Sequence, residues 1–146
     1  VTLVLNVSRA RGNSAGFELR LMLQDWGEGS SDAAREEGGG AIAGAGDATW
    51  IHQSRGDLIW NSLGGDYIDK PSATRPVSGV GSYIWGSTPE MVADVQTWLD
   101  SPTINFGWIV IGGETTKQSA KRFDSRENPS VSNRPVLTIE YMPETS

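Results

Sequence analysis

Tryptophan is the residue type best suited to ligand recognition in this chain, and two of its six tryptophans stand in polar surroundings. Sugars present flat C–H faces that stack on indole rings, and the ring N–H can donate to a hydroxyl group. Trp50 and Trp60 flank irregular polar segments, so we expect them to form a stacking platform for a sugar. Trp108 lies in an apolar run and Trp98 on a helical stripe, which places both in the expected core. Burial in the core is the alternative for Trp50 and Trp60 as well, and Trp26 is a further candidate for an exposed ring.

A basic segment near the C-terminus is the second candidate, because positions 117–134 carry five basic and two acidic residues. The guanidinium group of arginine binds carboxylates through paired hydrogen bonds. We therefore expect an acidic sugar to bind at Lys121, Arg122 and Arg126. The alternative is an internal network in which Arg126 or Arg134 clamps Asp124, Glu127 or a backbone carbonyl, and the closing position of the segment favours that alternative.

Acidic residues in glycine-rich loops offer a candidate metal site. Calcium requires several oxygen ligands at about 2.3–2.6 Å, and such loops can supply them. Asp47, Asp57 and Asp66 are the candidates for a structural Ca²⁺ ion, although their spacing does not follow the EF-hand pattern. His52 could join Asp47 or Asp57 as a metal ligand. A hydrogen-bonded structural role is the alternative for this histidine.

The sequence offers no catalytic constellation. Because there is no cysteine, disulfides, cysteine-ligated zinc and thiol nucleophiles are excluded. The single histidine excludes a two-histidine mechanism. Neither a P-loop nor a dinucleotide fingerprint occurs, and no spacing singles out a pair of acids for glycoside hydrolysis. We therefore expect a non-catalytic protein, and an enzyme acting on polysaccharide is a further alternative.

Charge and hydropathy narrow the class of partner. The net charge of −6 argues against nucleic acid and anionic membrane surfaces, since both favour basic faces. The longest apolar stretch, residues 106–111, falls far short of the roughly 20 residues of a membrane helix. We therefore expect neither nucleic-acid binding nor a membrane span.

The elements that must position these residues are short strands and one helix. The segment Ser87-Thr88-Pro89-Glu90 supplies a capping residue, an early proline and an early acid, which together predict a helix start. An amphipathic stripe then predicts a helix over residues 89–100. Many short strands with glycine turns and a single late helix favour an antiparallel β-sandwich of jelly-roll type, formed as one domain over residues 1–146.

Hydrophobic alternation predicts the strands. Residues 1–9 and 17–23 each show one buried face, and we expect them to pair as a hairpin or as near neighbours. Residues 106–111 predict a central strand that is covered on both sides. The glycine-rich segment 27–47 is expected to be a long loop. The remaining expectations are an irregular segment at 69–76 and strands at 77–85, 119–124 and 135–141.

Motifs spread over residues 1–141 resemble those of one known family. The closing segments Lys121–Pro129 and Asn133–Ile139 are similar to the final signature of DNRLRE domains, which are related to disaggregatase-type repeats. Further segments match the family's pattern in the same order: Val1–Val7, Asp25–Gly29, Gly46–Trp50, Trp60 with Gly64–Asp66, and Asn105–Trp108. The resemblance implies a secreted or cell-surface β-sandwich, commonly bacterial, and some relatives act as carbohydrate-binding modules. We therefore expect a non-catalytic extracellular module that binds a polysaccharide or a cell-surface glycan.

The opening of the chain departs from the family's pattern. An alternating strand begins at Val1, whereas domains of this family usually begin earlier with additional strands. We expect the sequence to be part of a longer protein and to lack those N-terminal strands. A sandwich without them exposes an unpaired edge, which a second copy could complete by strand addition. The alternative function is therefore a homo-oligomeric subunit of a surface layer or extracellular filament.

Overall fold

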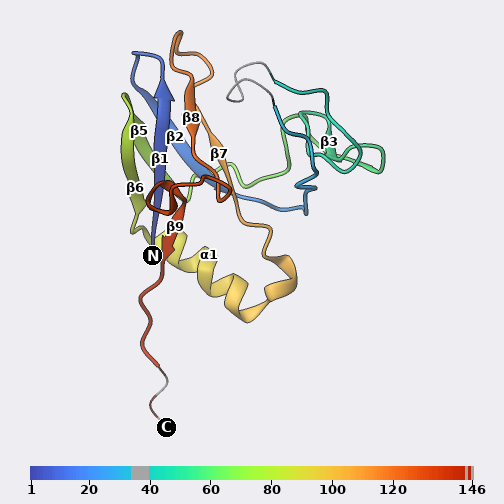
Figure 1. Cartoon of the computed structure of the whole chain (residues 1–146). Helices are drawn as coiled ribbons and strands as arrows, with labels where there is room; N and C mark the ends of the chain where they lie inside the picture. The colour runs from blue at the N-terminus through green and yellow to red at the C-terminus, as the bar shows by residue number, and fades with distance from the viewer. Residues whose placement is uncertain (34–39, 144, 146) are drawn as a thin grey trace.

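Two antiparallel sheets face each other across a hydrophobic core in the computed structural model, which describes residues 1–33, 40–143 and 145 (Figure 1). The first sheet has the order β6 (Gly81–Gly86), β1 (Thr2–Ala10), β8 (Lys121–Phe123), and β9 (Val136–Thr138) also pairs with β1. The second sheet has the order β5 (Ala73–Val77), β2 (Ala15–Leu21), β7 (Trp108–Ile111). Of the described residues, 32% are in strands and 13% in helices. This confirms the expected all-β, sandwich-like fold with one short helix.

The core forms where the inward faces of the two sheets meet. Alternation along β1 buries Leu5 and Val7, and alternation along β2 buries Phe17 and Leu19. The ring of Phe123 in β8 lies between the sheets, with its centroid 5.4 Å from that of Phe17. The remaining buried members of this cluster are Ala15, Ala73, Val77, Trp85 and Met91.

One buried hydrogen bond joins the two sheets directly. Trp85 in β6 is fully buried, and its indole Nε1 donates to the backbone carbonyl oxygen of Phe17 in β2 at 2.8 Å. The Trp85 ring also packs against Phe123, with centroids 6.1 Å apart. A buried indole N–H without an acceptor would be costly, so this bond fixes how the sheets lie relative to each other.

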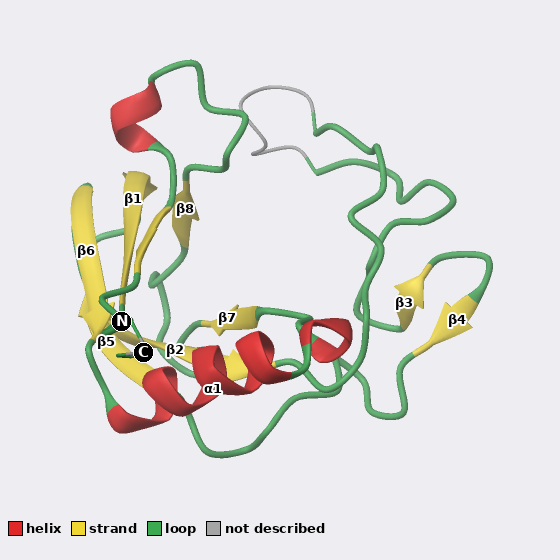
Figure 2. Cartoon of the chain, turned by 90° about the horizontal axis from the view of Figure 1, so that it is seen from below, coloured by secondary structure: helices red, strands yellow, loops and turns green. Residues whose placement is uncertain are grey.

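The one α-helix of the described residues, α1 (Pro89–Asp100), has the bounds 89–100 that the sequence predicts, and it lies beside β2 and β7 (Figure 2). Thr88 caps it, because its hydroxyl accepts a hydrogen bond from the N–H of Met91 at 3.0 Å. The helix buries Met91, Val95 and Trp98. Its Asp94 carboxylate accepts from the indole Nε1 of Trp108 at 2.7 Å, which attaches the helix to β7. Two short 3₁₀ helices, η1 (Pro102–Ile104) and η2 (Val131–Asn133), occupy later connections.

The structure corrects three strand expectations. Strands β1 and β2 do not pair, because each belongs to a different sheet. Strand β7 is an edge strand and not a central one, and its Val110 is 38% exposed. The expected strand at 77–85 is divided into the end of β5 and most of β6, so part of the segment expected to be irregular is also strand. Pro76 is tolerated there because β5 is a sheet edge, where no ladder N–H is required on the outer side.

A small lobe extends to one side of the sandwich, and it is formed by residues that lie between β2 and β5 in the sequence (Figure 1). It contains the hairpin of β3 (His52–Ser54) and β4 (Leu58–Ile59), in which His52 faces Ile59. Part of the glycine-rich segment expected to be a loop, residues 34–39, lies outside the described residues. Among the residues that the structure describes, no helix has the length and apolar character needed to cross a bilayer.

We predict that Trp85→Phe lowers the free energy of unfolding by about 2–4 kcal/mol, because it removes the bond to Phe17 and leaves a void. Urea unfolding followed by circular dichroism measures the change. Ile84→Ala is the matched control, since Ile84 is the neighbouring residue of β6 but is 51% exposed. An equal loss in the two variants would contradict the role assigned to Trp85.

Candidate functional site

The lobe holds Trp50 at the tip of a tight turn formed by Thr49–His52. The Thr49 N–H donates to the carbonyl oxygen of His52 at 2.9 Å, which closes the turn. The Thr49 hydroxyl oxygen accepts from the N–H groups of Ile51 and His52 at 3.1 and 3.0 Å. The turn leaves the Trp50 side chain 67% exposed, which is unusual for an indole ring.

His52 has a structural role in this turn. Its ring Nδ1 lies 3.0 Å from the Thr49 hydroxyl oxygen. The same oxygen accepts two backbone N–H groups, so the ring is tied to the hydroxyl that organises the turn. The hydrogen-bonded alternative for His52 therefore describes its observed contacts.

The ring of Trp50 packs against backbone, which holds it in place without burying it. Gly64 lies directly beside the ring, since a Cβ atom at this position would be 2.8 Å from Cη2 and Cζ3 of Trp50. The Gly64 N–H also donates to the carbonyl oxygen of Trp50 at 2.8 Å. With φ at +91°, Gly64 occupies a region that L side chains rarely adopt. Only glycine combines this backbone conformation with such close approach to the ring.

A polar hollow of about 370 Å³ opens beside Gly64. Both neighbours of this glycine, Leu63 and Gly65, belong to its wall. The other lining residues come from the end of β2 and from the segment that leads to β5: Leu23, Gln24, Asn61, Ser62, Asp66, Tyr67 and Asp69. The hollow therefore combines amide, hydroxyl and carboxylate groups, next to an exposed indole ring.

Asp66 organises the turn that separates Trp50 from the hollow. It is 8% exposed, and its carboxylate accepts from the backbone N–H and the side-chain Nδ2 of Asn61 and from the N–H of Ser62, at 2.9–3.0 Å. These bonds fix residues 61–66 around the carboxylate. The N–H of Leu23 donates to the carbonyl oxygen of Asp66 at 2.9 Å, which attaches this turn to the end of β2.

Trp60 does not serve as the platform expected from the sequence. The side chain is only 8% exposed, so its ring face is not available to a ligand. Its indole Nε1 donates to the carbonyl oxygen of Thr49 at 2.8 Å and thereby supports the turn that carries Trp50. Trp26 is 46% exposed, but its Nε1 is already bonded to the carbonyl oxygen of Phe106 at 2.9 Å.

The candidate metal ligands lie in separate places. Asp47 accepts from the N–H of Gly44 at 2.7 Å and from the hydroxyl of Ser31, so it organises its own loop. Asp57 is exposed in the turn between β3 and β4. Asp66 is engaged as described above. Within residues 1–33, 40–143 and 145, no three His, Cys, Asp or Glu side chains are grouped so that they could hold a metal ion.

The basic side chains of the candidate site form hydrogen bonds and ion pairs with other residues of the same chain. Lys121 Nζ donates to the carbonyl oxygens of Arg11 and Asn13, both at 2.7 Å, and Arg122 Nε donates to Ser8 Oγ at 3.0 Å. Arg126 forms ion pairs with Glu127 at 3.0 Å and with Glu28 at 2.5 Å. These two glutamates raise the pKa of Arg126 above its ordinary value. The internal network that we gave as the alternative is therefore present.

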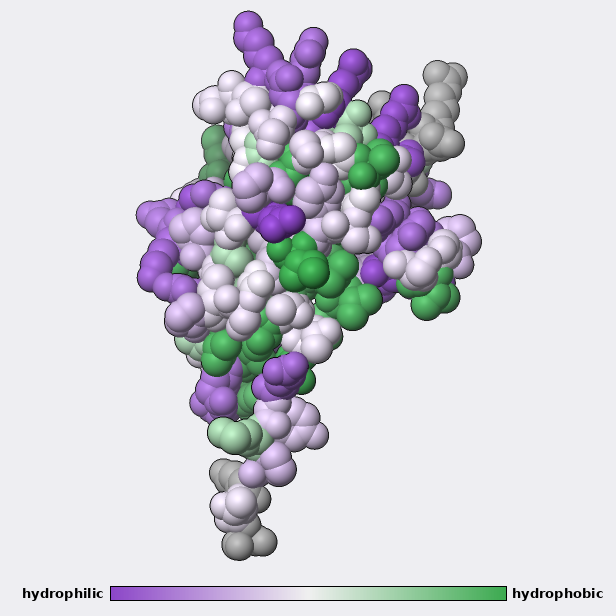
Figure 3. All heavy atoms as spheres, turned by 90° about the vertical axis from the view of Figure 1, so that its left-hand side faces the viewer, coloured by the Kyte–Doolittle hydropathy of each residue, from purple (hydrophilic) through white to green (hydrophobic). Residues whose placement is uncertain are grey.

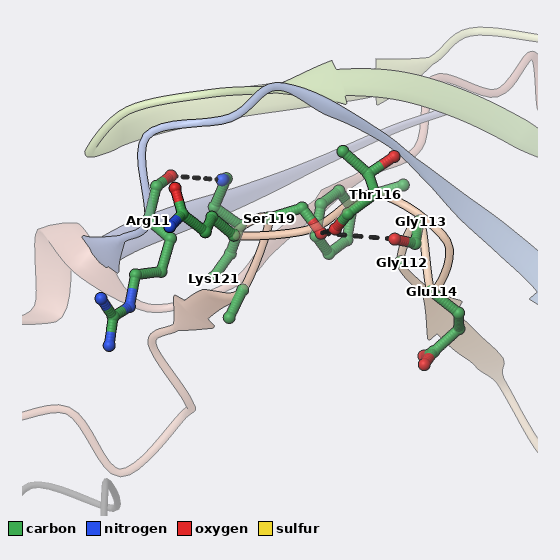
Figure 4. Close-up of a pocket in the computed structure, with 10 residues that line it drawn as sticks. Arg11, Gly112, Gly113, Glu114, Thr116, Ser119 and Lys121 are labelled. Carbon is green, nitrogen blue, oxygen red and sulfur yellow. Dashed lines mark hydrogen bonds between the residues drawn. The ribbon is translucent and has the colours of Figure 1, made fainter.

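A second hollow of about 470 Å³ is lined by residues at the end of β1, in β2, and in the connection from β7 to β8 (Figure 4). Lys121 and Arg11 line it together with Glu114, and Phe17 contributes apolar surface. This hollow shares no lining residue with the one beside Trp50. The structure therefore brings Trp50 and Asp66 close together in one place and sets Lys121 apart in another.

Comparisons with protein-family models, with characterised proteins and with solved structures give no match to this chain. The resemblance to DNRLRE domains therefore stays a prediction.

We predict that acidification loosens the loop around Asp47. Hydrogen bonds from the Ser31 hydroxyl and the Gly44 N–H lower the pKa of Asp47. A carboxyl group with a lowered pKa stabilises the folded chain above its unfolded pKa, and this contribution is lost as the pH falls through the folded value. Protection factors for amide exchange at Ser30 and Gly44 should therefore fall below about pH 4.

Asp47→Asn is the control for this measurement, because it keeps the shape of the side chain but removes the titration. We expect its protection factors to change little over the same range of pH. If the variant showed the same acid-induced loss as the parent protein, another group would control the loop.

Proposed function

We propose that this chain is a non-catalytic carbohydrate-binding module of a secreted or cell-surface protein. The single observation that carries the proposal is the exposed Trp50 ring, supported by Gly64 and adjacent to the polar hollow. One sugar unit of a polysaccharide can stack its C–H face on the indole, while the hydroxyl groups of a neighbouring unit reach the amides and carboxylates of the hollow across the turn of residues 61–66. No enzyme activity is part of this proposal.

The contacts that hold the exposed Trp50 ring in place favour a role in ligand binding over a role in packing. A ring held by Gly64 and by the backbone of its own turn loses little conformational freedom when a ligand arrives, so less binding energy is spent on ordering it. Its indole N–H has no hydrogen-bond partner among the described residues, which leaves the group available to a sugar hydroxyl.

We predict that Trp50→Ala lowers the affinity for a bound polysaccharide by about five- to thirtyfold, because removal of a stacking platform costs on the order of 1–2 kcal/mol. Affinity electrophoresis in gels that contain different polysaccharides identifies the ligand and measures the loss. Trp26→Ala is the matched control, since this ring is also exposed, but it does not pack against Gly64 and its Nε1 is already bonded to the carbonyl oxygen of Phe106.

The controls separate binding from stability. Circular dichroism must show that both variants are folded. Failure of the folded parent protein to bind any polysaccharide would argue against the proposed function. If Trp26→Ala and Trp50→Ala reduced binding equally, the proposed site would be wrong.

A second function, assembly by strand sharing, is favoured by the segment that follows β9. Strands β9 and β1 pair from Val136 opposite Val4 to Thr138 opposite Thr2. Residues 139–143 then project from the body of the molecule (Figures 1 and 3). Alternation places Ile139 and Tyr141 on one face of this segment, where they are 40% and 80% exposed. An extended, alternating segment of this kind could add to the sheet of a second copy.

We predict that, if strand sharing operates, light scattering shows self-association that increases with protein concentration. Replacing both Ile139 and Tyr141 with lysine should remove this self-association, because charges on that face oppose burial in a neighbouring sheet. Met142→Lys is the control, since Met142 is 94% exposed and alternates to the opposite face. A parent protein that stays monomeric at every concentration would exclude assembly by strand sharing.

A further inference from the structure

The lining of the hollow beside Trp50 restricts the class of sugar that can bind there, and this inference rests on the proposed carbohydrate-binding function. Among the residues that the structure describes, the polar side chains of its wall are amides, hydroxyls and carboxylates, with no lysine or arginine: Gln24, Asn61, Ser62, Asp66, Tyr67 and Asp69. Amide and hydroxyl groups both donate and accept, and carboxylates accept, which suits the hydroxyl groups of a sugar. We propose that this hollow binds an uncharged sugar unit and rejects sugars that carry a carboxylate.

Asp69 contributes much of the preference for uncharged sugars over sugars that carry a carboxylate. Its side chain is fully exposed, so its carboxylate can meet a ligand directly, unlike that of Asp66, which is taken up by Asn61 and Ser62. A sugar carboxylate in the hollow would face the like charges of Asp66 and Asp69, and the described lining residues include no cation to offset them. A neutral sugar can instead donate its hydroxyl protons to the same oxygens.

Arg20 forms a long ion pair with Asp69, but it does not reverse this charge. Its Nη2 atom pairs with Glu18 at 2.7 Å, whereas its Nη1 atom is 3.9 Å from Asp69. The guanidinium group also lies over the ring of Tyr67, with Cζ 5.5 Å from the centroid. With this side chain only 21% exposed and committed to Glu18 and Tyr67, Arg20 is not presented to a ligand in the hollow.

The other hollow has the opposite character, which makes the inference testable. Its wall includes Arg11 and Lys121 as well as Glu114. Any acidic polysaccharide that binds this protein should therefore bind there and not at Trp50. A variant of Arg11, which is exposed, reports on that hollow independently.

The test compares a polyuronate with its carboxyl-reduced form, which keeps the same linkages but has no charge. Affinity electrophoresis of the whole chain at low salt measures retention by each polymer, alongside a panel of neutral polysaccharides. We expect stronger retention by the reduced polymer, by about fivefold. Asp69→Asn should reduce this difference in retention between the reduced polymer and the polyuronate. Asp57→Asn should leave it unchanged, because Asp57 does not line the hollow and the variant removes the same net charge.

The outcomes distinguish the preference for uncharged sugars from the carbohydrate-binding function itself. Trp50-dependent retention of the polyuronate that equals or exceeds retention of its reduced form would overturn this inference but keep the carbohydrate-binding function. Retention of the polyuronate that Arg11→Ala removes and Trp50→Ala does not would support it. If no polysaccharide in the panel were retained, both this inference and the carbohydrate-binding function would be rejected.

Discussion

The hydrogen bond from the Trp85 indole to the Phe17 carbonyl oxygen is the contact on which the site ultimately depends. It fixes β2, the central strand of its sheet, against the opposite sheet. The end of that strand then holds the lobe, because Met22 pairs with Tyr67 and the N–H of Leu23 donates to Asp66. Tyr67 and Asp66 line the hollow beside Trp50. The position of an exposed ring is therefore set by a buried contact in the core.

Local signals in the sequence were enough to predict the helix, and non-local contacts were not predictable in the same way. The Thr88 cap and the stripe of Met91, Val95 and Trp98 are properties of adjacent residues, so the range 89–100 could be predicted. Alternation in β1 and β2 shows that each strand has a buried face, but it does not show which strand lies beside it. For that reason, the sequence did not predict that β1 and β2, which look like a hairpin, occupy opposite sheets.

The same limit applies to the candidate site. Trp50 and Trp60 have similar polar surroundings in the sequence, yet only Trp50 is exposed. The difference arises because the Trp60 indole donates to the Thr49 carbonyl oxygen and packs beneath the turn that presents Trp50. The hollow was missed for a related reason, since amides such as those of Gln24 and Asn61 and hydroxyls such as that of Ser62 are common on surfaces. The adjacent glycines before Asp66 were the one available signal of close packing at this point.

The most direct test of the account is a titration of the isotopically labelled chain with a bound oligosaccharide, followed by NMR. The central claim is that the sugar lies on Trp50 and enters the adjacent hollow. The account predicts that the largest shift changes occur at the Trp50 indole N–H and at backbone amides of residues 61–67. Changes confined to residues 112–121, which form much of the other hollow, would contradict it.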